Sequence, residues 1–165
     1  MNFETLNTIL KNPSWDVVVF FVFLAVGFFY GISAGRSKLL ALVFSLYVSG
    51  FLFENFYYLG EITNGRTIME EFLIRGGVFL ALVIVLTVTF SKVLVSGYDS
   101  GPKNWWKAFL LSFSATGLLF SFLFHLFPGR EVFTFSPMIQ NIFASNASFF
   151  WWLLTPLVAL FIARK

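Results

Sequence analysis

The chain has 165 residues, of which 58% are hydrophobic and 12% are charged. A soluble domain carries roughly 25% charged residues, and a water-surrounded core could not hide this much apolar surface, which includes 25 phenylalanines. The absence of cysteine excludes disulfides and thiolate metal sites, and a single histidine excludes a histidine-rich metal site. The net charge of +3 does not indicate nucleic-acid binding, because the basic residues stand at the ends of apolar runs.

The apolar runs predict one all-α membrane domain over residues 1–165, a bundle of about five transmembrane helices whose solvent is the lipid bilayer. Each run approaches the roughly 20 residues that cross a bilayer core. The spans are expected at about residues 15–34, 37–57, 74–95, 105–127 and 147–163. Two amphipathic segments, 2–11 and 137–145, are expected as short interfacial helices, with a partly ordered tail as the alternative for the first. Ser136 followed by Pro137 predicts the start of the second.

Polar residues mark the ends of the expected helices. Ser14 is expected to cap the first span, with Asp16 in its first turn, where the helix dipole favours an acidic side chain. Thr67 and Glu70 have the spacing of a capping box ahead of the third span. Pro156 should kink the fifth span, which a membrane helix tolerates when neighbouring groups satisfy the freed carbonyl.

A turn rich in glycine and basic residues joins the first two spans. Gly27, Gly31 and Gly35 recur every four residues. Helices in lipid gain nothing from burying apolar surface against each other, so close contact between them needs small residues. The glycines therefore predict a helix-packing seam, with a pore lining as the alternative. Arg36 and Lys38 follow at once and are expected to fix this turn in the cytoplasm.

The lysines and arginines predict the orientation of the bundle. The larger group falls on the side of the glycine-rich turn: Arg36, Lys38, Lys92, Lys103, Lys107, Arg164 and Lys165. The smaller group falls on the other side, with most of the acidic residues: Lys11, Arg66, Arg75 and Arg130. Because cytoplasmic loops carry the excess of positive charge, the N-terminus is expected outside and the C-terminus in the cytoplasm.

The fourth span carries a polar stripe, because Ser114, Gly117, Ser121 and His125 share one helical face. In one interpretation the hydroxyls bond carbonyls of their own helix and the small residues aid packing. In the other, the stripe lines a water-filled path with His125 as a titrating group near its mouth. No acidic partner or oxyanion element accompanies Ser121 and His125 in the sequence, so we expect no catalytic residues, no cofactor and no metal ion.

Charged residues surround the loop between the second and third spans. Glu54 lies within a belt of aromatic residues typical of a membrane interface. It is expected either to be solvated or to pair with Arg75, which would otherwise also lie close to the hydrocarbon. Glu71 and Arg75 stand four residues apart and form a second candidate pair.

Three features occur together in this chain: Asp16 at the start of the first span, the turn from Gly31 to Lys38 leading directly into the second, and a loop containing Gly97, Asp99 and Gly101 before the fourth. In these features the chain resembles the colicin V production protein (CvpA) family of bacterial inner-membrane proteins, over roughly residues 14–127. The resemblance implies a multi-pass protein of the bacterial inner membrane. It also implies an accessory envelope role, linked to toxin export and envelope stress, without known catalytic residues.

Two functions are consistent with the sequence. The first is a non-enzymatic membrane protein that acts by helix-mediated assembly, with itself or with another envelope membrane protein, in secretion or envelope homeostasis. The second is a small oligomeric channel or transporter with a path along Ser114, Ser121 and His125. No ionisable residue stands in the middle of a predicted span, which argues against ion-coupled transport but leaves an uncharged pore open.

Overall fold

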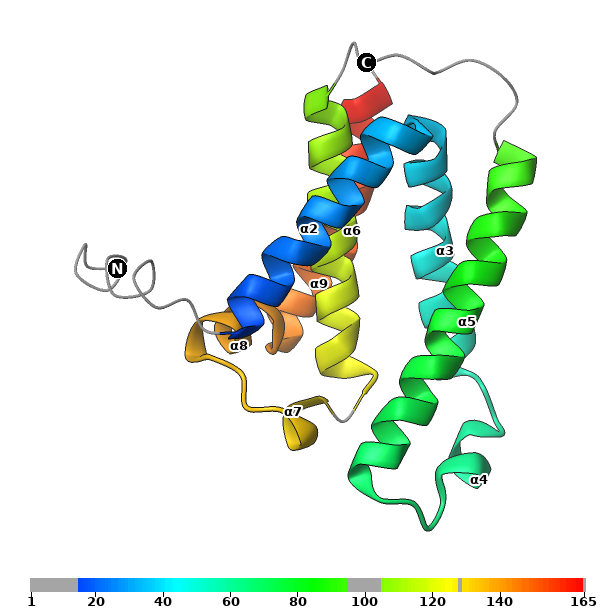
Figure 1. Cartoon of the computed structure of the whole chain (residues 1–165), viewed down its shortest axis with the longest axis vertical. Helices are drawn as coiled ribbons and strands as arrows, with labels where there is room; N and C mark the ends of the chain where they lie inside the picture. Colours follow the sequence, from blue (N-terminus) through cyan, green and yellow to red (C-terminus); the bar gives the residue numbers. More distant parts are fainter. Residues whose placement is uncertain (1–14, 95–104, 128, 165) are drawn as a thin grey trace, which may run out of the picture.

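The computed structural model describes residues 15–94, 105–127 and 129–164, and these ranges form helices joined by short connections, without strands (Figure 1). The predicted interfacial helix over residues 2–11 lies outside the described residues. The helices are α2 (Trp15–Ala34), α3 (Arg36–Glu54), α4 (Leu59–Thr63), α5 (Ile68–Leu94), α6 (Trp105–His125), α7 (Gly129–Val132), α8 (Pro137–Phe143) and α9 (Asn146–Arg164).

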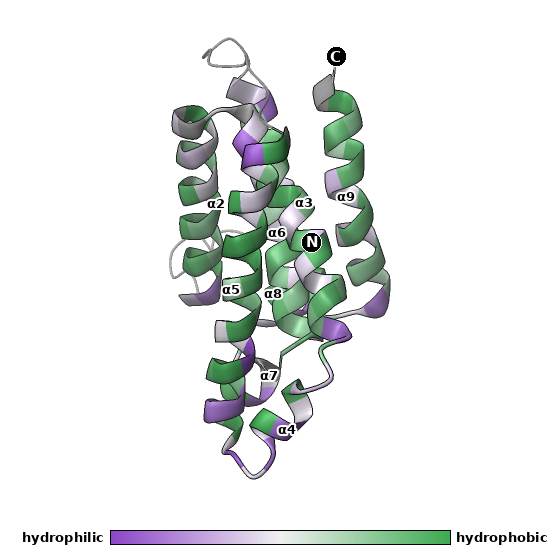
Figure 2. Cartoon of the chain, turned by 90° about the vertical axis from the view of Figure 1, so that its right-hand side faces the viewer, coloured by the Kyte–Doolittle hydropathy of each residue, from purple (hydrophilic) through white to green (hydrophobic). Residues whose placement is uncertain are grey.

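The all-helical membrane-type architecture is confirmed. Four described helices, α2, α3, α5 and α6, are long and apolar enough to cross a membrane, and a fifth span results if α8 and α9 are taken together. These two helices enclose an angle of 65°, and the bend falls between them. Hydrophobic residues cover most of the long helices, while many hydrophilic residues gather at the end of the bundle where α4 and α7 lie (Figure 2).

The polar helix starts expected at two places are confirmed. The Thr67 amide donates to the Glu70 carboxylate at 3.0 Å, and the Glu70 amide donates to the Thr67 hydroxyl at 3.3 Å. Together these bonds form a capping box. Ser136 is the N-cap of α8, where its hydroxyl accepts from the Ile139 amide and Pro137 occupies the first turn.

Helix α6 is the central helix of the bundle, because it packs against α2, α3 and α9 and also touches the short helices α7 and α8. In its most apolar stretch 67% of the residues are buried, against 6% in α5. Helix α5 stands at the edge of the bundle beside α3 (Figure 1). Helix α6 is therefore central and α5 peripheral, although both are apolar enough to span a membrane.

Small residues let the neighbouring helices approach α6 closely. Gly27 of α2 lies against Ser112, and Gly31 lies against Leu39 and Ala108. Gly117 of α6 lies directly under the Trp152 ring of α9, so a Cβ atom there would overlap the indole. These contacts put backbone and side chain in direct apposition, which is the kind of packing that holds helices together in lipid.

Gly35 belongs to the turn rather than to a helix face. Its φ is 89°, in the left-handed region that glycine adopts without strain, and its carbonyl accepts from the Lys38 amide at 3.2 Å. The connection between α2 and α3 is consequently a single residue, and the chain reverses direction there.

Helix α9 continues through Pro156, which is buried. Proline has no N–H, so the Trp152 carbonyl loses its helical partner. The carbonyls on either side gain side-chain donors. The Tyr47 hydroxyl of α3 donates to the Leu153 carbonyl, and the Thr155 hydroxyl donates to the Trp151 carbonyl. The turn around the proline is therefore supported from both α3 and α9.

The contact between Gly117 and Trp152 predicts a large effect of a single methyl group. Trp152 cannot easily move aside, since its indole N–H donates to the Ile142 carbonyl at 3.0 Å and its ring stacks on Phe143. Overpacking of this kind costs typically about 1–3 kcal/mol, which is partly offset by the roughly 1 kcal/mol that alanine gains over glycine in a helix. Because the added Cβ would overlap the indole, Gly117→Ala should still lower the free energy of unfolding. The measurement is denaturant unfolding in mixed micelles.

A matched control is Gly76→Ala in α5, where an added Cβ meets nothing within 4 Å. Alanine is favoured over glycine in a helix by roughly 1 kcal/mol, so this variant should be as stable as the parent or more so. Equal losses in both variants would contradict a specific role for the contact between Gly117 and Trp152.

Candidate functional site

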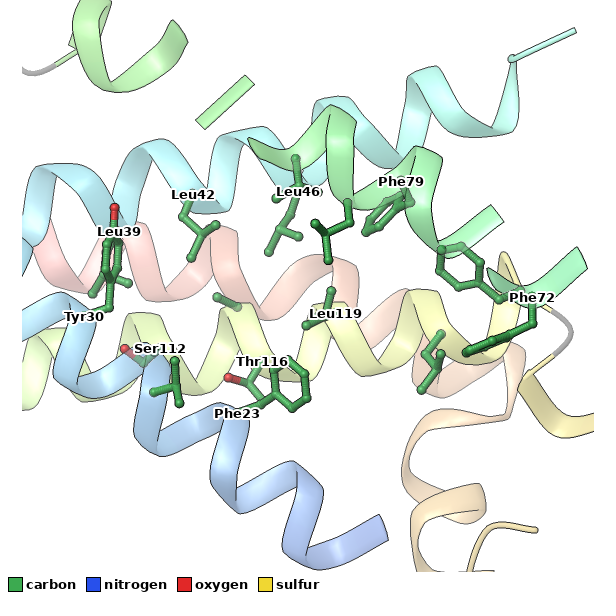
Figure 3. A pocket seen from close by; sticks show the side chains of 18 residues that line it. Phe23, Tyr30, Leu39, Leu42, Leu46, Phe72, Phe79, Ser112, Thr116 and Leu119 are labelled. Carbon is green, nitrogen blue, oxygen red and sulfur yellow. The ribbon is translucent and has the colours of Figure 1, made fainter. Parts of the chain in front are cut away.

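A cavity of about 360 Å³ lies between α2, α3, α5 and α6 and is partly open to the surroundings. Each of the four helices contributes to its wall, for example through Phe23, Leu42, Phe79 and Leu119 (Figure 3). The volume falls within the range of about 300–1,000 Å³ that is usual for ligand pockets. Since the wall is assembled from four separate helices, no local sequence pattern predicts it.

Polar groups are few in this wall. Tyr30, Ser112 and Thr116 supply hydroxyls, and no charged side chain lines the cavity. The Ser112 hydroxyl is buried and has no hydrogen-bond partner within the described part of the chain. A wall of this composition can hold an apolar molecule, and it brings no carboxylate or imidazole to a substrate.

The predicted polar stripe of α6 lies on a different face. Ser114 and Ser121 are fully buried, and the Ser114 hydroxyl donates to the Leu111 carbonyl of its own helix at 2.9 Å. Gly117, between them in the stripe, lies under Trp152 of α9. The structure thus brings Ser114 and Ser121 together beneath α9, and neither lines the cavity.

His125 ends the same stripe. Its Nδ1 lies 3.0 Å from the Ser121 carbonyl, and its ring stacks on Phe149 of α9 with centroids 4.2 Å apart. The Nε2 atom is buried without a partner among the described residues, and the buried Ser121 hydroxyl is likewise without one. The imidazole is therefore bonded to the backbone rather than to the serine hydroxyl, and no group of three potential metal ligands forms in the described ranges.

Of the two alternatives for Glu54, the structure shows an exposed side chain, and the described residues contain no ion pair between Glu54 and Arg75. Arg75 pairs with Glu71 at 2.7 Å, and Glu54 is exposed at the end of α3. Glu71 stands one turn before Arg75 on the same helix, so this pair forms without fixing two separate elements. Its stability contribution is small, since half-exposed i,i+4 pairs are worth about 0.3–0.5 kcal/mol.

Asp16 has a role that its position at a helix start did not reveal. Its side chain is 1% exposed. One carboxylate oxygen accepts from the Ser136 amide at 2.6 Å, and the other accepts from the Val17 amide at 2.9 Å. This carboxylate therefore joins the start of α2 to the N-cap of α8, 120 residues later. Neither residue carries a sequence signal for the other.

The two ends of the bundle differ in charge. Lys38, Lys92 and Lys107 stand near the start of α3, the end of α5 and the start of α6, which lie at one end (Figure 1). The acidic residues Glu54, Glu61, Glu70, Glu71 and Glu131 belong to the segments at the other end. Arg36 begins α3 at the basic end. The bundle thus has an electrical polarity along its long axis.

The buried bond between Asp16 and Ser136 predicts that Asp16→Ala destabilises the bundle. The change leaves the Ser136 amide without its acceptor, and an orphaned buried donor costs about 1–3 kcal/mol. Asp16→Asn keeps one carbonyl oxygen and should lose less. Unfolding of both variants in micelles, compared with Glu131→Ala at an exposed acid, measures the effect. Equal stability of Asp16→Ala and Glu131→Ala would contradict a structural role of the bond.

No protein-family model, curated protein or solved structure matches this chain. The resemblance to the CvpA family therefore stays a hypothesis that rests on Asp16, the glycine-rich turn and the loop before α6.

Proposed function

We propose that this chain is a non-enzymatic membrane protein that acts by assembly, and that α5 is the helix through which it associates with a second copy. The observation that carries this proposal is a pair of small residues on the exposed face of α5. Gly77 and Ala81 stand four residues apart, and both are exposed. A Cβ atom added at Gly77 meets nothing within 4 Å.

The spacing of Gly77 and Ala81 is that of a helix-association motif in membranes, where small residues allow two backbones to approach. Ile84 and Val88 continue the same face at helical spacing, and both are exposed. We call Gly77, Ala81, Ile84 and Val88 the α5 seam. It lies opposite the side of α5 that packs on α3 through Phe79, so a partner helix could reach it without disturbing the bundle.

The glycines of α2 are less suited to assembly, because Gly27 and Gly31 already pack against α6 and α3 inside the chain. The polar stripe of α6 is likewise covered by α9, with Ser121 fully buried. Both features serve packing within one copy, which favours assembly through α5 over a pore along α6.

The setting of this assembly follows from charge and resemblance. The excess of lysine and arginine near the start of α3 and the start of α6 favours that end as the cytoplasmic one, with the N-terminus outside. The resemblance to the CvpA family suggests the bacterial inner membrane and an accessory role in secretion or envelope homeostasis. A different envelope membrane protein on the α5 seam is the alternative partner.

The proposal predicts that Gly77→Leu weakens self-association in liposomes. A bulky side chain in a close helix contact costs typically about 1–3 kcal/mol, and 1.4 kcal/mol corresponds to a factor of about ten. Energy transfer between donor- and acceptor-labelled copies should therefore give a dissociation constant about tenfold higher or more. The control is Ala25→Leu, which places the same leucine side chain at an exposed alanine of α2.

Single cysteines locate the contact, and the chain has no native cysteine to remove. Val88→Cys on the α5 seam should form a disulfide-linked dimer on mild oxidation, whereas Phe29→Cys on the exposed face of α2 should not. A dissociation constant unchanged by Gly77→Leu, together with no Val88→Cys dimer in purified protein, would contradict self-association through α5.

A further inference from the structure

We propose that the cavity between α2, α3, α5 and α6 is a binding site for one acyl chain of an anionic membrane phospholipid, with the phosphate at the basic end of the bundle. The wall of the cavity is apolar apart from three hydroxyls, and it is partly open to the surroundings. An apolar space of this kind does not hold water well. A membrane-spanning bundle is surrounded by hydrocarbon, so the apolar molecule that can enter the open cavity is a lipid chain.

The cavity is elongated along the helices. On α5 the lining residues run from Phe72 to Val83, and on α6 those within the helix run from Ser112 to Leu123. Each stretch rises about 16 Å at 1.5 Å per residue. The acyl chains of one leaflet fill half of a hydrocarbon core roughly 30 Å thick, or about 15 Å. Each of these two stretches is therefore long enough for one acyl chain, and the wall continues along α3 to Leu39 and past α6 to Phe127.

The end of the cavity formed by Tyr30 and Leu39 suits a phosphate headgroup (Figure 3). Lys38 directly precedes Leu39 and is exposed. It stands one turn before the lining residue Leu42, so it projects from the same side of α3. Its ammonium group can reach the headgroup region while its stem follows the helix. The Tyr30 hydroxyl, at the same end, adds a hydrogen-bond donor.

The opposite end of the cavity is unsuited to an anion. It is lined by Phe72, Phe79 and Phe127, and Glu71 beside Phe72 is already paired with Arg75. The exposed Glu70 adds further negative charge there. These groups fix the direction of the lipid, with the phosphate near Lys38 and the methyl end of the chain near Phe72.

This site is separate from the α5 seam. The cavity uses Gly76, Phe79 and Val83 on one side of α5, whereas Gly77 and Ala81 lie on the exposed side. A lipid in the cavity and a second copy on the seam can therefore be present together, and each can be removed by its own substitution.

The test uses full-length protein in nanodiscs that contain phosphatidylglycerol carrying a photoactivatable group in one acyl chain. After irradiation, mass spectrometry maps the labelled residues. We expect labels on cavity residues such as Leu42, Leu46 and Leu119 in excess over exposed residues of α2 such as Phe21 and Phe29. Phosphatidylcholine and a free fatty acid with the same photoactivatable group show how far the anionic headgroup contributes.

Two variants address the two halves of the site. Gly76→Leu fills the cavity from α5 at a position with open space around it, and it should reduce cavity labelling about tenfold. Lys38→Glu removes the cation at the headgroup end and should reduce labelling by phosphatidylglycerol about fivefold, the effect of one lysine on anionic lipid. The controls are Ala25→Leu on the exposed face of α2 and Lys92→Glu on α5, which should leave cavity labelling unchanged.

Circular dichroism and thermal unfolding establish that each variant is folded before labelling is compared. Labels spread evenly over cavity and exposed residues would overturn the proposal, as would labelling insensitive to Gly76→Leu. Protection of the cavity by a second copy, seen as cavity residues labelled only after dilution to monomers, would overturn it in favour of a helix as the occupant. Unchanged labelling in Lys38→Glu would overturn the placement of the phosphate.

Discussion

The bundle is held together by close packing and polar bonds, because the hydrophobic effect does not drive helices together in lipid. Because a leucine surrounded by acyl chains is as well solvated as a leucine in the bundle, helices associate where shape and polar bonds hold them together. In this chain shape is supplied by small residues around α6, with Gly27 and Gly31 on one side and Gly117 under Trp152 on another. The polar bonds come from Asp16 to Ser136 and from Tyr47 to Leu153. Where small residues and polar bonds are missing, the neighbouring helices do not pack closely.

The same constraint explains the two uncovered features. Helix α5 is fixed to α3 in part by the hydrogen bond between Ser45 and Thr87 at 2.6 Å, and α3 is its main partner in the bundle. The space between α2 and α5 is therefore left as the cavity, and the outer face of α5 is left as the α5 seam. In water these apolar surfaces would be buried against each other. In a bilayer they can stay uncovered, because lipid chains solvate them. The proposed assembly and the proposed lipid site both depend on the loose packing of α5 against the rest of the bundle.

Much of the fold follows from the sequence, because hydrophobic length and capping residues act locally. Long apolar helices are found at the first four predicted spans, and the capping box of Thr67 and Glu70 and the N-cap at Ser136 are found where the residues predict them. Burial is different. Helix α5 is the most apolar of the described spans and is buried over 6% of its apolar stretch, whereas α6 is less apolar and is buried over 67%. In lipid an apolar surface does not seek the interior, so hydropathy cannot rank helices by depth. The long-range contacts could not be predicted either. Nothing in the sequence near Asp16 indicates its bond to Ser136, and Arg75 pairs with Glu71 on its own helix and not with Glu54.

The burial of Ser114 and Ser121 on α6 is the feature that favours packing over a water-filled path. Its most direct test is the reaction of single cysteines with a membrane-impermeant maleimide, applied from either side of liposomes. Ser114→Cys and Ser121→Cys replace fully buried hydroxyls by thiols of similar size, and Tyr57→Cys outside the spans is the reactive control at an exposed position. The account predicts rapid labelling of Tyr57→Cys and no labelling of the two α6 variants until the protein is unfolded. Labelling of Ser114→Cys and Ser121→Cys in the folded protein would show water along α6 and contradict it.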